Sequence, residues 1–530
     1  MEVLKPFPFE LKGFQLDTIP RVALSKMVVF GADTGTGKSV MTICALGMLF
    51  EDGLLDHLVL EAEPSKLIEW EADLKRFTSL SVARYDRPPE RRAKLRESLP
   101  QVLLGTYETF RADLAPKDPS RLSKRSWNPK GRSRPTTAHV VPGPLLEALR
   151  GRRTIMVLDE GTSKMGATRT SWTYQAHLLT RRELGNDGLR MWVLSATPMS
   201  RDPVGYFNTA RLLDPVLAGT IGSFEHDHIR SRDEFGVPKD FKNLDRSDDS
   251  GVVPLVKKLE GLVVYRSKAE PEIAQWFPAK VADPPETPGY TFVDPTELEE
   301  EFWGAVQGTY ASRADEDTLS GLMRQLVGHP LALTLSRGAM AADIVRLVGA
   351  EGLKRLPTSK LDVLVTKLRS IGSAQAVVFT FFGQSVLPLV AQRLADEGIA
   401  CVVNHGQLSP TQRELARKGF NAGEVQVYLS SDAGARGVNL PAGQWVIDYD
   451  VAPTAEVGRQ RRDRIDRIDS PHKVIYFTSL VMRGTVEMGL AHLSARRQAW
   501  AEKLGSFDGS GLSAATRKAV LNANRTVRTL

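Results

Sequence analysis

The stretch GADTGTGKSVMTI, residues 31–43, follows the short apolar run MVVF at residues 27–30. An apolar strand, a glycine-bearing turn and a helix that begins with Lys-Ser together predict a phosphate-binding loop. The strict pattern requires a glycine five residues before the last glycine of the loop, and Ala32 occupies that position. Taken alone, the stretch fits a nucleotide site or an ordinary strand-to-helix turn.

The composition is that of a folded protein with several domains. A chain of 530 residues is too long for one core, and 42% hydrophobic with 25% charged residues argues against wholesale disorder. The net charge of +7 favours a polyanionic partner only weakly. Two cysteines, Cys44 and Cys401, exclude a disulfide framework and favour a reducing interior. We expect no signal peptide and no membrane span, since no window holds 18 uninterrupted apolar residues.

Short apolar runs alternate with helical patterns in two separate stretches of the chain. The runs are rich in Val, Ile and Leu, which is typical of parallel strands covered on both faces. They lie at residues 26–31, 56–62, 101–107, 154–160 and 191–197 in the first stretch, and at 376–382, 399–405, 425–431, 444–450 and 473–479 in the second. This pattern predicts an α/β protein with two parallel-sheet domains in tandem.

The same pattern suggests domain limits. We expect the first sheet domain at residues 1–210 and the second at 351–495, with a mostly helical region at 211–350 and a C-terminal helix and basic tail at 496–530. Residues 111–153 of the first domain hold eleven Lys or Arg against three Asp or Glu. This basic insertion is interpreted either as a solvated, partly disordered loop or as a loop that contacts DNA.

In the phosphate loop, each residue type suits a task. Gly35 and Gly37 allow backbone N–H groups to approach phosphates closely, Lys38 reaches the β- and γ-phosphates, and the Ser39 hydroxyl is suited to Mg²⁺. A tight structural turn remains the alternative for this stretch alone.

An acidic pair, Asp159-Glu160, ends the apolar run TIMVL at residues 154–158. One carboxylate would hold the Mg²⁺ shell, and the other would orient and deprotonate an attacking water. An isolated acidic pair at a strand end is more often solvated. Here it follows a phosphate loop, and LSATPM at residues 194–199 adds Ser195 and Thr197, small hydroxyls suited to relaying the state of the acids to another surface.

The second stretch contains an arginine-rich segment, GRQRRDRIDRID, at residues 458–469. Arg464 and Arg467 lie three residues apart, so on a helix both would face one side. A guanidinium that reaches the γ-phosphate from a second domain stabilises transition-state charge as an arginine finger. The alternative is a solvated charged helix with internal Arg–Asp pairs.

In this order, the motifs resemble superfamily 2 helicases, and within them the Swi/Snf-like DNA translocases. LKGFQ at residues 11–15 resembles the family's adenine-reading glutamine motif, and VLEAEPSKLIEWEADLKRF at 59–77 resembles its second motif. LLGTYETFRAD at 103–113 is similar to the family's Thr-Tyr-Glu segment, and QRRDRIDRIDS at 460–470 matches its Gln-x-x-Asp-Arg-x-x-Arg-Ile pattern. The resemblance covers about residues 8–490.

The resemblance implies two RecA-like domains with ATP and Mg²⁺ bound between them. It assigns nucleotide binding to Gln15, Thr34, Gly35, Thr36, Gly37, Lys38, Ser39, Gly437 and Gln460. It assigns catalysis to Lys38, Asp159, Glu160, Arg464 and Arg467, coupling to Ser195 and Thr197, and Mg²⁺ to Ser39 and Asp159. Ser65 and Thr106 would contact the phosphates of the nucleic acid.

The chain departs from the family at the acid motif, which reads Asp-Glu-Gly-Thr where the family usually has His at the fourth place. Thr162 therefore makes the family's usual coupling contact from this position to LSATP an open question, and the expectation of ATP hydrolysis stands. We interpret Trp70 and Trp276 as packing residues rather than base-stacking platforms.

The expected function is an ATP-dependent DNA motor that moves along DNA, with duplex favoured and branched or single-stranded DNA also open. The alternatives are a nucleotide-gated DNA clamp or recruitment module with little turnover, and a motor subunit for a nuclease partner. The compact size favours a bacterial or phage protein in the cytoplasm of its cell. The residues leave open DNA or RNA, strand separation or translocation, and polarity.

Overall fold

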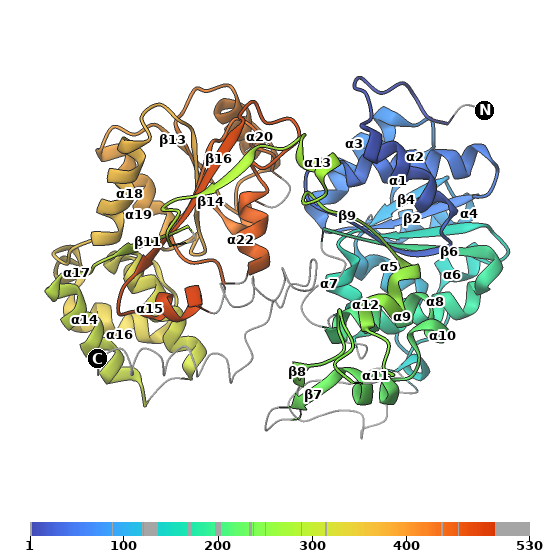
Figure 1. Cartoon of the computed structure of the whole chain (residues 1–530), viewed down its shortest axis with the longest axis horizontal. Helices are drawn as coiled ribbons and strands as arrows, with labels where there is room; N and C mark the ends of the chain where they lie inside the picture. The colour runs from blue at the N-terminus through green and yellow to red at the C-terminus, as the bar shows by residue number, and fades with distance from the viewer. Residues whose placement is uncertain are drawn as a thin grey trace. The chain divides into compact units, whose positions relative to one another are not determined.

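The computed structural model describes residues 3–492, except for residues 87, 119, 121–135, 167–170, 197–202, 233–235, 237, 250, 288, 313–314, 436–437 and 454. The described chain forms two compact units that divide between Ile273 and Ala274 (Figure 1). Each unit is built on a parallel sheet, as the two sets of apolar runs predicted.

In the first unit, seven of the described strands form one parallel sheet in the order β3-β4-β2-β5-β6-β1-β9. These strands are β1 (Met27–Ala32), β2 (His57–Glu61), β3 (Val82–Arg84), β4 (Val102–Gly105), β5 (Thr154–Leu158), β6 (Leu189–Ser195) and β9 (Val263–Arg266). The carboxyl ends of β5, β6 and β1 are therefore neighbours. The acid pair, Ser195 and the phosphate loop follow these three ends, which brings them to one edge of the sheet.

Both faces of this sheet are buried because the side chains of each strand alternate between two cores. Val28 and Phe30 of β1 belong to the core that contains Trp70, whereas Val29 belongs to the core that contains Tyr107 and Phe110.

The helices of this unit are α1 (Gly13–Leu24), α2 (Lys38–Glu51), α3 (Pro64–Phe77), α4 (Pro89–Glu97), α5 (Tyr107–Leu114), α6 (Pro144–Leu149), α7 (Gly161–Gly166), α8 (Trp172–Gly188), α9 (Pro203–Leu213), α10 (Pro215–Ala218), α11 (Ile221–His228) and α12 (Leu255–Leu259), with short 3₁₀ turns η2 (Thr137–His139) and η3 (Glu260–Leu262).

The region 211–350, expected to be mostly helical, is divided between the two units. Its first part holds an antiparallel hairpin of β7 (Ile229–Arg232) and β8 (Pro238–Phe241), and then β9, which pairs with β1. Val263 lies opposite Val29, so β9 belongs to the first sheet and the residues before it belong to the first unit. Helix α13 (Pro271–Ala274) spans the division.

In the second unit, the described strands follow the order β10-β16-β15-β12-β14-β13, and β11 also pairs with β16. All of these pairings are parallel. The strands are β10 (Ala279–Ala282), β11 (Tyr290–Val293), β12 (Ala376–Thr380), β13 (Cys401–Asn404), β14 (Val427–Ser431), β15 (Trp445–Asp448) and β16 (Val474–Met482). Long β16 pairs with β10 along its first half and with β11 along its second half.

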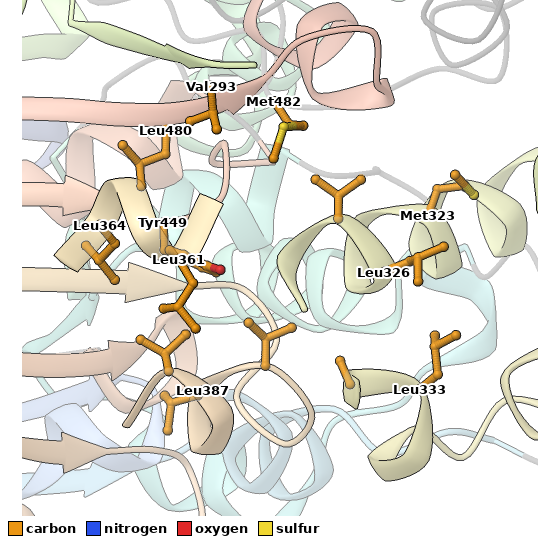
Figure 2. Packing of buried hydrophobic residues seen from close by; sticks show 14 of the residues in the cluster. Val293, Met323, Leu326, Leu333, Leu361, Leu364, Leu387, Tyr449, Leu480 and Met482 are labelled. Carbon is orange, nitrogen blue, oxygen red and sulfur yellow. The ribbon is translucent and has the colours of Figure 1, made fainter. Parts of the chain in front are cut away.

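The helices that precede β12 share a core with this second sheet. Figure 2 shows Leu326 and Leu333 of the helical segment in the same buried cluster as Leu361, Tyr449 and Leu480. This packing makes residues 297–354 part of the second unit. The helices are α14 (Glu297–Tyr310), α15 (Glu316–Gly328), α16 (Ala339–Val348), α17 (Ala350–Lys354), α18 (Ser359–Ser370), α19 (Leu387–Asp396), α20 (Pro410–Asn421), α21 (Asp432–Ala435) and α22 (Ala455–Arg462), with 3₁₀ turn η4 (Pro330–Leu335). Within the described ranges, every helix is too short or too polar to cross a membrane.

Candidate nucleotide site

The phosphate loop joins β1 to α2 and needs its two glycines. Gly35 and Gly37 have φ angles of 86° and 89°, a left-handed backbone that other residues adopt at a cost. A Cβ atom on Gly37 would lie 2.4 Å from Nε2 of Gln15. The buried Thr36 hydroxyl donates to the carbonyl of Asp33 at 2.7 Å. The loop is thus held as a compact turn between Thr34 and Ser39, at the N-terminus of α2.

Gln15 of α1 contacts this loop directly. Its Nε2 donates to the Thr36 carbonyl at 2.8 Å, and its Oε1 accepts from the Lys12 backbone N–H at 2.9 Å. The structure therefore brings the glutamine motif and the phosphate loop together. The recognition of adenine by Gln15 stays a prediction.

Lys38 and Glu160 face each other across the edge of the sheet. The Lys38 Nζ lies 3.6 Å from Glu160 Oε1, and 44% of the Glu160 side chain is exposed. Glu160 has a φ angle of 51°, which is uncommon for a residue with a side chain and is often found at functional sites. The phosphate-loop lysine and the second acid are thus close enough to act on one ligand.

Asp159, in contrast, is buried and held from two directions. The indole Nε1 of Trp70 donates to Asp159 Oδ2 at 2.9 Å, and the Tyr107 hydroxyl donates to the Asp159 carbonyl at 2.8 Å. Burial raises the pKa of Asp159 above its usual value, and Glu160 adds to the rise, while Lys38 and the Trp70 N–H oppose it. Trp70 is buried, as expected of a packing residue, whereas Trp276 is 41% exposed and lies outside the core, so its role as a packing residue stays a prediction.

The donor set at this edge fits Mg²⁺. Hydroxyl and carboxylate oxygens such as those of Ser39 and Asp159 are the hard ligands that Mg²⁺ prefers. The carboxylate of Asp159 is desolvated and its charged form is disfavoured, a condition that a nearby divalent cation relieves. The two residues therefore suit the ion that the family resemblance implies.

Thr162 contacts the strand end that the family's His was expected to reach. The Thr162 hydroxyl, on α7, donates to the Ser195 hydroxyl at 2.7 Å, and both side chains are buried. A direct bond thus links the acid motif to LSATP even though the residue type differs from the family. Thr197, the other residue predicted to couple, lies outside the described residues.

Asp33 of the phosphate loop binds the end of β9 and the residues just after it, a contact that sequence reasoning missed. Asp33 accepts from the Tyr265 hydroxyl at 2.7 Å, from the Ser267 hydroxyl at 3.2 Å and from the Lys268 backbone N–H at 2.7 Å. Its own N–H donates to the carbonyl of Arg266 at 3.0 Å. No local pattern signals this contact, because the partners are more than 230 residues apart.

The predicted nucleic-acid residues lie on the same unit. Thr106 follows β4 and caps α5, where its Oγ1 accepts from the Thr109 backbone N–H at 3.3 Å. Ser65 lies in α3, but its side chain is outside the described part of the chain. Phosphate contacts by these two residues stay predictions.

In the second unit, the arginine-rich segment begins on α22 but does not stay helical. Gln460 lies on the helix, which ends at Arg462, and Arg464 and Arg467 lie in the turns that follow. The expectation that a helix aligns these two arginines is wrong. The helix ends because the Arg464 carbonyl accepts from the Leu440 N–H at 2.9 Å and Ile465 enters the core. Gly437 lies outside the described residues.

Arg461, which sequence reasoning did not single out, is the buried arginine of this segment. Its guanidinium binds both carboxylate oxygens of Asp432 at 2.7 and 2.9 Å and lies 3.1 Å from Asp448 and 3.5 Å from Asp450. Burial lowers the pKa of Arg461, but the carboxylates, Asp448 first, outweigh it and raise the pKa overall. Arg461 thus fixes the loops that follow β14 and β15, next to Gln460.

A family model described as the helicase conserved C-terminal domain matches residues 359–469. The chain is 23% identical over 527 residues to the CHD3-type chromatin-remodeling factor PICKLE of Arabidopsis thaliana, which covers 92% of this chain and 33% of that protein. It is 28% identical over 160 residues to the pre-mRNA-splicing ATP-dependent RNA helicase PRP28 of Pyricularia oryzae, over 29% of this chain and 23% of that protein. The chain spans about a third or less of the length of these relatives.

A solved structure of the Pyrococcus furiosus Hef helicase domain is similar in fold. It has a TM-score of 0.52 and 15% sequence identity, and the match covers 92% of this chain and 98% of that chain. This likeness concerns the tandem RecA-like fold. The matches in sequence confirm the resemblance to superfamily 2 helicases of the Swi/Snf-like type, and the solved structure supports the fold alone.

Proposed function

We propose that this protein is an ATP-dependent DNA translocase that uses ATP hydrolysis between its two RecA-like lobes to move along duplex DNA. The observation that carries the proposal is the approach of Lys38 to Glu160, 3.6 Å apart at the carboxyl edge of the first sheet. In this arrangement, Lys38 would bind phosphates beside the partly exposed carboxylate of Glu160, which would be accessible to a water molecule.

In this proposal, the residues of the first unit bind and prepare the nucleotide. Gln15 would recognise adenine, while Thr34 to Ser39 would surround the phosphates with backbone N–H groups and the Lys38 ammonium. Ser39 and Asp159 would hold Mg²⁺, which when bound neutralises phosphate charge. Glu160 would orient the attacking water and accept its proton.

The second unit would complete the reaction. Arg464 and Arg467 would stabilise the charge that develops on the γ-phosphate, and Gln460 and Gly437 would line the nucleotide. Because ATP would bind residues of both units, its hydrolysis would change how strongly they associate. Thr162 and Ser195 would pass the state of the acids to another surface of the protein.

DNA is favoured over RNA as the nucleic acid along which the protein translocates. The relative that matches nearly the whole chain is named a chromatin-remodeling factor, whereas the one named an RNA helicase matches a much shorter segment. Ser65 and Thr106 would bind backbone phosphates without reading sequence. Affinity should therefore fall as salt rises, because binding releases counterions.

The test is a comparison of ATP hydrolysis rates with duplex DNA, single-stranded DNA, branched DNA and RNA, together with a strand-displacement assay. Duplex DNA should stimulate hydrolysis most, without separation of the strands. Stimulation of ATP hydrolysis by RNA and not by DNA would overturn the choice of DNA over RNA. A protein that binds DNA in a nucleotide-dependent manner but releases no phosphate would instead be the clamp or recruitment module.

A further inference from the structure

We propose that Trp70 is a positioning residue that orients the carboxylate of Asp159 toward the Mg²⁺ ion. This inference rests on the proposed function, because it takes the predicted metal ligand as its starting point. It adds a role to a tryptophan that the sequence presents only as a packing residue.

The geometry makes Trp70 a fixed donor. Trp70 lies on α3, is 2% exposed and belongs to the core between this helix and the sheet, so its ring has little freedom to move. Its indole Nε1 donates to Asp159 Oδ2 at 2.9 Å. An indole N–H donates only, so the bond requires an acceptor oxygen and cannot reverse.

This bond sets the direction of the whole carboxylate. A carboxylate is planar, so a bond that holds Oδ2 also fixes where Oδ1 points. The Tyr107 hydroxyl holds the backbone of the same residue through the Asp159 carbonyl, at 2.8 Å. Asp159 is therefore held at main chain and side chain by aromatic residues from α3 and α5, on opposite faces of the sheet.

Such partners of metal ligands control metal affinity. Removal of a residue that hydrogen-bonds a ligand commonly costs about 10- to 100-fold in metal affinity or activity. Trp70→Phe keeps the ring in the core and removes the N–H. It should raise the Mg²⁺ concentration for half-maximal nucleotide binding by about tenfold.

The chain offers a matched control in Trp192. This residue is also buried in the first unit, and its Nε1 also donates a hydrogen bond at 2.9 Å, but to the carbonyl of Ser25. Trp192→Phe thus removes an equivalent indole bond away from the acids. It should lower thermal stability about as much as Trp70→Phe and leave the Mg²⁺ dependence unchanged.

The experiment measures binding of a fluorescent ADP derivative to the full chain over a series of Mg²⁺ concentrations, without catalysis. A half-maximal concentration that rises for Trp70→Phe alone supports the proposal. An unchanged value for Trp70→Phe, or an equal rise for both variants, would overturn it. In an Asp159→Asn background, Trp70→Phe should add nothing, and a further tenfold loss there would also contradict the proposal.

A wild-type protein that binds ADP without any Mg²⁺ dependence would instead count against the proposed function itself. If Trp70→Phe does not fold, the wild type still provides a test by ¹⁹F NMR with 5-fluorotryptophan. The Trp70 resonance, assigned by elimination with Phe variants at the other positions, should shift when Mg²⁺ joins the ADP complex. A Trp70 resonance as unresponsive as that of Trp192 would contradict the proposal.

Discussion

At the scale of single residues, the acid pair shows two carboxylates in opposite environments. Asp159 is buried and bonded to Trp70, whereas the Glu160 side chain is 44% exposed and faces Lys38. Neighbouring groups in such different surroundings are suited to different tasks. The buried one suits a metal, and the exposed one suits a water molecule.

Glu160→Gln should abolish ATP hydrolysis and leave nucleotide binding in place. The amide preserves the shape of the side chain but accepts no proton from water, so the loss belongs to the chemical step. Phosphate release should fall by at least about a hundredfold, the lower range for a general base. Hydrolysis by the purified variant at the wild-type rate would remove Glu160 as the base.

Thr162→Val should weaken the coupling of hydrolysis to DNA. Valine keeps the shape of threonine and removes the hydroxyl that donates to Ser195 at 2.7 Å. The ratio of DNA-stimulated to basal hydrolysis should fall several-fold, with a smaller change in the basal rate. Thr162→Ser retains the hydroxyl and should keep the wild-type ratio, and an equal ratio in all three proteins would refute the role.

At the scale of elements, the turn η4 is capped by a histidine that must stay neutral. His329 Nδ1 accepts from the Leu331 backbone N–H at 3.1 Å, which only an unprotonated ring nitrogen does. Burial, with a smaller effect of Arg393, lowers the pKa of His329 from 6.5 to about 4. Protonation of His329 therefore removes this hydrogen bond and disfavours the folded cap.

This histidine makes the stability of the second unit depend on pH. The pKa of His329 is lower in the folded than in the unfolded chain. Neutral His329 therefore makes its full contribution to the free energy of unfolding above pH 6.5, and this contribution is lost as pH falls toward 4. Between pH 7.5 and pH 4.5 the loss should amount to about 2 to 3 kcal/mol. His329→Asn keeps a capping oxygen but does not titrate.

Urea unfolding at both pH values tests this prediction, and the difference between wild type and His329→Asn isolates the histidine from the carboxylates that titrate in the same range. The free energy of unfolding should fall by about 2 to 3 kcal/mol more in the wild type. An identical fall in the two proteins would show that His329 is not responsible.

The sequence predicted the interior strands and the edge strand β13 well, and the edge strands β3, β9 and β10 poorly. The apolar run at 154–160 became β5, and the run at 376–382 became β12, because strands buried on both faces consist of continuous apolar residues. Strands β3 and β10 are short and partly exposed, so they lack that signal. Strand β9 was missed for the same reason, and with it the connection of residues 263–266 to the first sheet.

The site was predictable where a motif is local and not where a contact is distant. Gly35, Gly37 and Lys38 stand together in the chain, so their spacing indicated either a phosphate loop or a tight turn, and the other motifs favoured the phosphate loop. The bonds from Trp70 to Asp159 and from Tyr265 to Asp33 join residues 89 and 232 positions apart, and only the fold brings them together. Where α22 ends likewise depends on Leu440, which lies on another segment and whose backbone N–H donates to the Arg464 carbonyl.

At the scale of the whole molecule, the proposed reaction needs residues from both units. Arg467→Ala should therefore lower turnover by about a thousandfold, the lower range for an arginine finger, and change ADP affinity far less. Steady-state hydrolysis and equilibrium ADP binding measure the two effects. Arg369, an exposed arginine of the same unit that pairs with Glu397, provides the control as Arg369→Ala. Unchanged turnover in Arg467→Ala would exclude it as the finger.

The bonds of Asp33 have a mechanical consequence for such a motor. Tyr265 of β9, with Ser267 and Lys268 just after this strand, holds the phosphate loop shortly before the chain passes to the second unit at Ala274. A change in the backbone of the loop must break these bonds or carry residues 265–268 with it. The point at which the chain leaves the first unit would then move with the loop, and the short connection after Lys268 would determine how much of that displacement is transmitted.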